Sequence, residues 1–234
     1  MKSSFRKFFS AKNIATLAVL MALVVVLQSV ALVTSIFLPT SLSLVLIPIV
    51  LGAMLLGPLA GGVLGFLFGF VVLIFGIAGV DKFTAALLAD TPAMTVLICF
   101  VKGIAAGVVP GLLYKPIAKK NKLAAAIVAA LSAPIVNTGL FIVGCLMITG
   151  TIGQFTATGT MNEIVYFLFI GCAGINFLIE VAINIVLSPA IHRIVLVVEK
   201  NYANKKGKAV STEENEETGE GVAPTESSET ENKS

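Results

Sequence analysis

Charged side chains are scarce in this chain and unevenly spread along it. Only 12% of the 234 residues are Asp, Glu, Lys or Arg, whereas 57% are hydrophobic. Four charged residues occur between positions 13 and 112, and only Glu163 and Glu180 occur between positions 123 and 191. Ordinary soluble domains carry about 25% charged residues. The composition therefore excludes a soluble domain and favours segments that cross a lipid bilayer, which takes roughly 20 apolar helical residues.

The residues and motifs of common enzyme sites are also missing. The single histidine, His192, adjoins Arg193 at the end of the last apolar run, and no GxxxxGK[ST], GxSxG or HExxH motif occurs. The three cysteines lie inside apolar segments without CxxC spacing. We therefore expect no catalytic residues, no cofactor, no metal site, no disulfide and no binding of nucleic acid.

The apolar runs are continuous rather than alternating, which indicates helices and not a barrel. Gly57-Pro58 is a turn signal between two of the runs. The predicted fold is all-α, a compact bundle of six transmembrane helices. The expected spans cover residues 14–38, 42–56, 59–77, 92–114, 123–147 and 164–198.

Lysine and arginine gather in three places, and such residues stay on the cytoplasmic side of short loops. The clusters lie in residues 2–12, 115–122 and 193–208, whereas the other connections hold one basic residue, Lys82. Six spans place all three clusters on one side of the membrane. We therefore expect a plasma-membrane protein with both termini in the cytoplasm.

The predicted organisation has three parts: a basic N-terminus over residues 1–13, a membrane domain over 14–198 and a cytoplasmic tail over 199–234. From about residue 211 the tail contains one lysine and eight glutamates without an apolar period. Such composition is typical of disorder.

Small residues recur four apart in several spans, a spacing that lets helices approach closely in lipid. Three ladders predict packing inside the bundle, and they comprise Gly61, Gly65 and Gly69; Gly103, Gly107 and Gly111; and Ala125, Ala129 and Ala133. The first span carries a fourth set, Ala11, Ala15, Ala18 and Ala22. Spacing alone leaves open whether this set packs internally or meets a partner helix.

Two ionisable residues lie deep in predicted spans, where each costs at least ~2.5–3.5 kcal/mol to insert. Lys102 lies 11 residues after Thr91, about 16 Å below the outer surface, and Glu180 lies 17 residues after Glu163, about 25 Å down. Their depths allow the lysine to reach the carboxylate or a ligand beside it.

Neutral polar residues accompany them. Asn176, Glu180 and Asn184 follow one another at i, i+4 and i+8, which puts them within about 80° of arc on one helical face. Asn137 and Gln28 are lone amides in other spans. The structural alternative is a buried Lys102–Glu180 pair with amides tying helices together. The functional alternative is a polar pocket open to the outside, whose lysine favours an anionic group.

The sequence resembles the S component of energy-coupling factor (ECF) vitamin transporters. The resemblance covers about residues 11–198 and rests on the six-span layout, the first-span alanines and two segments. These are LSLVLIPIVLGAMLLGPLAGGVLGFLFGF (42–70), where two spans meet at a Gly-Pro turn, and APIVNTGLF (133–141). Within the family, the branch handling folate and pantothenate is nearest.

The resemblance implies a binding subunit that captures a small vitamin for an ATP-driven importer. It places the substrate near the outer face, beneath the loops at 34–43, 78–91 and 148–163. Lys102 and Asn137 would hold it, with Asn176 as a third residue and Glu180 and Gln28 as further candidates. Because the chain has no tryptophan and two of its three tyrosines lie at membrane edges, a small flexible acid such as pantothenate is expected.

The resemblance also implies partners. The alanines of the first span would contact a transmembrane coupling subunit, and two separate ATPase subunits would supply the energy. Two other functions fit the residues. One is a lone carrier that uses Glu180 as its proton site, and the other is a structural membrane protein with an internal Lys102–Glu180 pair.

Overall fold

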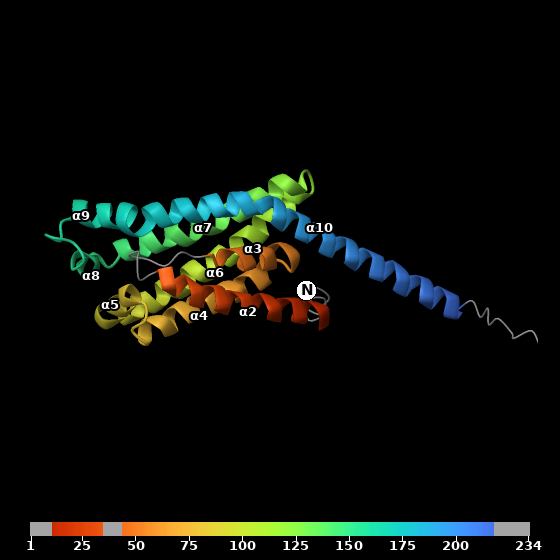
Figure 1. Cartoon of the computed structure of the whole chain (residues 1–234), viewed down its shortest axis with the longest axis horizontal. Helices are drawn as coiled ribbons and strands as arrows, with labels where there is room; N and C mark the ends of the chain where they lie inside the picture. The colour runs from red at the N-terminus through yellow and green to blue at the C-terminus, as the bar shows by residue number, and fades with distance from the viewer. Residues whose placement is uncertain (1–10, 35–43, 218–234) are drawn as a thin grey trace, which may run out of the picture. The chain divides into compact units, whose positions relative to one another are not determined.

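The computed structural model describes residues 11–34 and 44–217, and the whole of this part is helix, turn or short connection (Figure 1). Five helical stretches of the described chain are long and apolar enough to cross a membrane. They are Asn13–Ala31, Pro58–Ile77, Pro92–Ala118, Lys122–Leu146 and Met161–Val198. The all-helical prediction is therefore confirmed, while the cytoplasmic placement of the termini stays a prediction.

The helices follow the predicted spans closely. The first five long elements are α2 (Ala11–Thr34), α3 (Leu46–Leu55), α4 (Pro58–Ile77), α6 (Pro92–Ala118) and α7 (Lys122–Leu146). The sixth predicted span comprises α9 (Met161–Tyr166), a π-helical segment η1 (Phe167–Gly174) and α10 (Ile175–Glu217).

Two boundaries differ from the expectation. Helix α3 has 10 residues, about 15 Å at 1.5 Å per residue, which is half of a hydrocarbon core. Helix α10 continues to Glu217, past the expected start of the acidic tail near residue 211. The remainder of the tail, 218–234, and the connection 35–43 lie outside the described residues.

The contact between α4 and α6 is made by backbone against backbone. A Cβ atom added at Gly65 would collide with the carbonyl oxygen of Gly103, and one added at Gly107 would collide with that of Gly61. A Cβ atom added at Gly69 would likewise lie 2.5 Å from the carbonyl oxygen of Cys99. The glycine ladders therefore serve internal packing, as predicted from their spacing.

The alanine ladder of α7 is also internal. Ala125, Ala129 and Ala133 are fully buried and belong to the main apolar core, together with Leu64 and Phe68 of α4. Asn137 is the next residue on the same face, one turn further along the helix. The ladder thus points Asn137 into the bundle.

Short helices gather at one end of the bundle, where the sequence analysis expected loops (Figure 1). They are α5 (Lys82–Asp90), α8 (Thr149–Gly153) and α9. Asp81 caps α5, since its carboxylate accepts hydrogen bonds from the Thr84 backbone N–H at 3.2 Å and from the Thr84 hydroxyl at 2.6 Å. At the other end of α5, the Thr151 hydroxyl of α8 donates to the Asp90 carboxylate.

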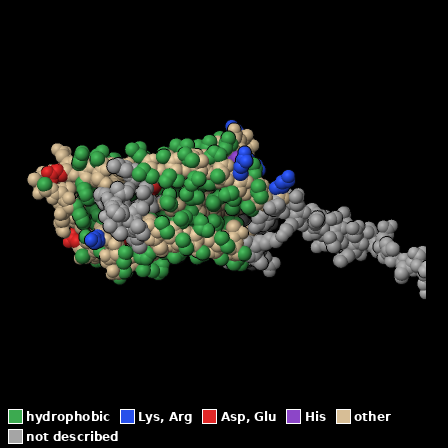
Figure 2. Space-filling model, viewed as in Figure 1, with side chains coloured by type: hydrophobic (Ala, Val, Ile, Leu, Met, Phe, Trp, Pro, Cys, Tyr) green, Lys and Arg blue, Asp and Glu red, His purple; other side chains and the backbone are tan. Residues whose placement is uncertain are grey.

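The lateral surface is apolar, as a lipid-facing surface must be. Figure 2 shows hydrophobic side chains covering the visible face, with acidic side chains at the end that carries α5 and α9. Large side chains such as Val63, Val101 and Val143 are 41%, 44% and 56% exposed. The larger polar side chains within the spans, such as Gln28, Asn137 and Glu180, are buried instead.

The glycine contact predicts a stability difference between two matched substitutions. Gly65→Ala forces α4 away from α6 and should cost about 1–3 kcal/mol, as overpacking of a tight interface does. Gly139→Ala in α7 meets open space, so it should leave stability unchanged or raise it by up to ~1 kcal/mol. Thermal unfolding of the two purified variants measures this, and equal melting temperatures would contradict the assignment.

Candidate ligand-binding site

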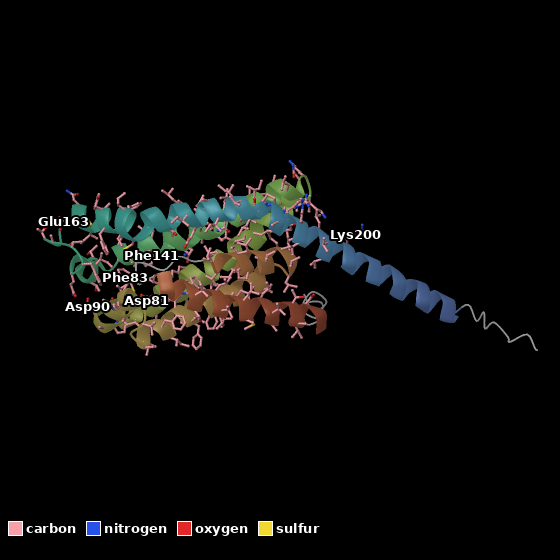
Figure 3. The ribbon with its side chains drawn as sticks, in the orientation of Figure 1. Asp81, Phe83, Asp90, Phe141, Glu163 and Lys200 are labelled. Atoms are coloured by element: carbon pink, nitrogen blue, oxygen red, sulfur yellow. The ribbon has the colours of Figure 1, made fainter. Side chains whose placement is uncertain are left out.

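A small polar cavity lies between α4, α5, α6, α7 and the last span. Its volume is about 70 Å³. Three of its lining residues carry charges, namely Asp81, Lys102 and Glu180, and three are neutral and polar, namely Thr84, Asn137 and Thr138. The rest of the wall is mainly aromatic, from Phe68, Phe83, Phe141 and Phe177. Figure 3 shows Asp81, Phe83 and Phe141 near the end of the bundle that carries α5.

Lys102 projects from α6 between two aromatic rings. Its Nζ atom lies 5.0 Å from the ring centroid of Phe141 and 5.8 Å from that of Phe68. Both distances are in the range of a cation–π contact. The neighbouring glycines explain the direction of the side chain, because Gly103 is pressed against Gly65 and α6 cannot rotate without breaking that contact.

Asn137 supplies a buried acceptor to the cavity. Its side chain is 6% exposed, and its Oδ1 atom has no hydrogen-bond partner among the described residues. A buried polar atom without a partner costs ~1–3 kcal/mol, so most such atoms in proteins are satisfied. A ligand N–H or O–H group in the cavity would satisfy this oxygen.

Glu180 reaches the cavity from α10 and is 4% exposed. One turn later, Asn184 is 2% exposed and its side-chain amide donates to the Glu180 backbone carbonyl at 2.8 Å. These two members of the predicted polar stripe face the bundle interior, as expected. Asn176 lies in α10, but its side chain is outside the described side chains.

The structure thus brings Lys102, Asn137 and Glu180 to one cavity. Gln28 is 2% exposed on α2 and lies away from the lining, and its Oε1 has no partner among the described residues. Because no bound molecule is present, the roles of these residues in binding stay predictions.

Several lining residues were missed from the sequence. Asp81 and Thr84 belong to a segment that was interpreted as a loop, although the D-x-x-T spacing is a helix-capping signal. The aromatic wall was not predicted, because only tryptophan and tyrosine were considered as partners for a ring, whereas the chain contains 15 phenylalanines. Phe83 is central, with its ring 6.0 Å from Phe141 and 5.2 Å from Phe155.

The alanines of the first span lie on the outside of the bundle. Ala15, Ala18 and Ala22 are exposed, whereas Leu20 and Val24 on the opposite face of α2 are buried in the core. The side chain of Ala11 is outside the described side chains. The described part of the ladder therefore does not serve packing within this chain.

The fold and the cavity are those of a multi-pass, all-helical membrane protein with a polar cavity among its spans. The model of the family described as ECF transporter, substrate-specific component, matches residues 12–192. The chain therefore belongs to this family, and it is the binding subunit of a transporter and not an enzyme. A search of curated proteins and a search of solved structures returned no match.

The cap at Asp81 makes a local prediction, because it holds the helix that closes the cavity. Asp81→Ala removes both bonds to Thr84 and should destabilise the first turn of α5 by about 0.5–2 kcal/mol. Hydrogen exchange of the α5 amides should therefore accelerate about two- to thirtyfold, with little change in α4 or α6. Lys82→Ala, at the exposed neighbouring residue, is the control, and equal exchange in both variants would refute the capping role.

Proposed function

We propose that this S component captures a small carboxylated vitamin from the outer side of the membrane and holds its anionic group in the cavity beside Lys102. The observation that supports this most directly is the meeting of Lys102 and the unsatisfied Asn137 oxygen in one enclosed space. The lysine offers a charge-assisted hydrogen bond to an anionic group. The asparagine requires a hydrogen-bond donor on the same solute.

The cavity also contains the carboxylates of Asp81 and Glu180. Both oxygens of Asp81 already accept bonds from Thr84. The solute that fits this set carries a carboxylate together with N–H or O–H groups. Pantothenate has these groups without an aromatic ring and folate has them with rings, and the site is compatible with the chemistry of either head group.

Family membership implies association with an ECF energy-coupling module. We propose that the module's transmembrane subunit docks on the exposed alanine stripe of α2, through Ala15, Ala18 and Ala22 with Ala11 as its continuation. Small side chains let a second helix approach closely, which is the main source of helix association in lipid. Two ATPase subunits of the module would then drive release of the solute to the cytoplasm.

Removing the cavity's polar groups should weaken binding. Lys102→Met loses a charge-assisted bond worth about 1.5–3 kcal/mol, so the dissociation constant should rise roughly 10- to 150-fold. Asn137→Ala loses a neutral bond, with an expected rise of about 2- to 13-fold. The ligands are pantothenate, folate and any solute that mass spectrometry finds in the purified protein, measured by calorimetry.

The matched control is Val101→Met, at the lipid-facing neighbour of Lys102, which should bind as the wild type does. If both site variants retain wild-type affinity for a solute that binds the protein, the cavity is not the binding site.

Blocking the alanine stripe should separate capture from transport. Ala18→Trp places a bulky ring where the coupling helix would approach, so vitamin uptake by cells should fall to background while the purified variant binds normally. Leu112→Trp is the control, because Leu112 is 57% exposed on a different helix, α6. Normal uptake by Ala18→Trp would exclude this surface as the docking site.

The buried carboxylate of Glu180 supports a second candidate function, that of a lone carrier that uses this residue as its proton site. Collapsing the proton gradient without depleting ATP should leave uptake intact if the chain works with an ATP-driven module. Loss of uptake under that treatment, with normal ATP levels, would favour the carrier.

A further inference from the structure

A second hollow lies beside the cavity, at the same end of the bundle. This outer groove has a volume of about 460 Å³, and its wall is mainly apolar and aromatic. Its lining comes from the connection before α9 and from the start of the last span, and it includes Phe155, Ala157, Tyr166, Phe167, Ile170 and Gly171.

The ring of Phe83 links the walls of the two hollows. Phe83 lines the polar cavity, and its ring lies 5.2 Å from that of Phe155 and 6.4 Å from that of Phe167, both of which line the groove. The rings of Phe155 and Phe167 stack on each other at 5.9 Å with an interplanar angle of 6°. The partition between cavity and groove is therefore made of aromatic side chains.

The segment η1 forms a second shared wall. Gly171 faces the groove, while the next two residues, Cys172 and Ala173, line the cavity. π-Helical segments are rare and occur frequently at functional sites. Here the π-helical turn places consecutive residues of one span against both hollows.

The volumes show why the cavity needs the groove. A volume of about 70 Å³ leaves room for only a few water molecules. Ligand pockets for small organic molecules measure about 300–1,000 Å³. The cavity can accept a polar head group but not a whole vitamin, whereas the groove alone falls within the required range.

We propose that the cavity and the outer groove are two halves of one solute site, separated by the ring of Phe83. The solute places its anionic, hydrogen-bonding head beside Lys102 and Asn137 and a flat apolar ring in the groove against Phe155 and Phe167. This inference rests on the proposed capture function, and it selects a ring-bearing carboxylated solute over a flexible acid that lacks a ring.

The test uses Cys172, which is 3% exposed and lines the cavity, as a reporter of access through the groove. In a Cys99→Ala/Cys145→Ala background in lipid nanodiscs, the rate at which N-benzylmaleimide modifies Cys172 is measured by mass spectrometry. Phe83→Ala opens the partition, so the rate should rise by about tenfold or more. N-ethylmaleimide, which lacks the phenyl ring that the groove would hold, should gain less.

Two further variants identify the route. Phe83→Ala/Ala157→Trp fills the groove from its rim and should return the rate toward that of the parent. Phe66→Ala, at a ring of α4 that stacks on Phe100 at 4.8 Å, should leave the rate unchanged. Phe83→Leu provides a milder opening if the alanine variant does not fold.

Three outcomes would overturn the proposal. These are an unchanged rate in both Phe83 variants, equal acceleration of the two maleimides, and acceleration that survives Ala157→Trp. Equal acceleration is also the result expected if a lipid acyl chain occupies the groove. The assay needs neither a solute nor a coupling module, so it can fail while vitamin capture stands and succeed while vitamin capture fails.

Discussion

The direct contact between the backbones of α4 and α6 is the constraint on which the rest of this structure depends. Lipid offers helices no hydrophobic gain for associating, so close van der Waals approach has to hold them together. The carbonyl oxygen of Gly61 lies where a side chain on Gly107 would be, and that of Gly103 lies where a side chain on Gly65 would be. The contact therefore sets both the separation of the two helices and the rotation of each one about its axis.

The cavity follows from that rotation. Lys102 immediately precedes Gly103, and with Gly103 held against α4 its side chain extends toward the rings of Phe68 and Phe141. A lysine in hydrocarbon is costly, and the two rings offer its ammonium group a partial substitute for water. On α7 the buried alanine ladder has the corresponding effect on Asn137. Two tightly packed ladders thus aim two polar groups at one space.

The end of the bundle that carries α5 is built by a different principle. Helix α5 is short, capped by Asp81 and joined through Asp90 to Thr151 of α8. Its side chains Leu87 and Phe83 pack into the smaller of two apolar clusters. An element this short can open at a lower free energy than the long spans. Because Phe83 lies at its first turn, movement of α5 would change the partition between cavity and groove.

The exposed face of α2 completes the picture of a subunit that works with others. An alanine ladder is ambiguous in a sequence, because the same spacing serves internal and external contacts equally well. Burial removes the ambiguity for α7, where the ladder lies at 0% exposure, and for α2, where the described alanines are exposed. The family associates with an energy-coupling module, and the stripe is the surface on which we propose that the module docks.

The sequence by itself determined the elements that depend on local composition. Long apolar runs must form helices in lipid because each backbone polar group has to be satisfied within its own segment. The spans and the inward direction of Glu180 and Asn184 could therefore be predicted, as could the glycine ladders of α4 and α6. The D-x-x-T cap of α5 is equally visible in the sequence, but the charged segment that contains it was interpreted as a loop.

Only the tertiary structure decided which residues share a space. Helix α4 carries phenylalanines on more than one face, so the sequence does not distinguish an exposed ring, such as Phe66, from one that lines a cavity, such as Phe68. The grouping of Phe83 with Phe155 and Phe167 joins α5 to a segment about 70 residues or more further along the chain. Such groupings arise from helix rotation and crossing, which the packing of neighbouring helices sets and which no single segment encodes.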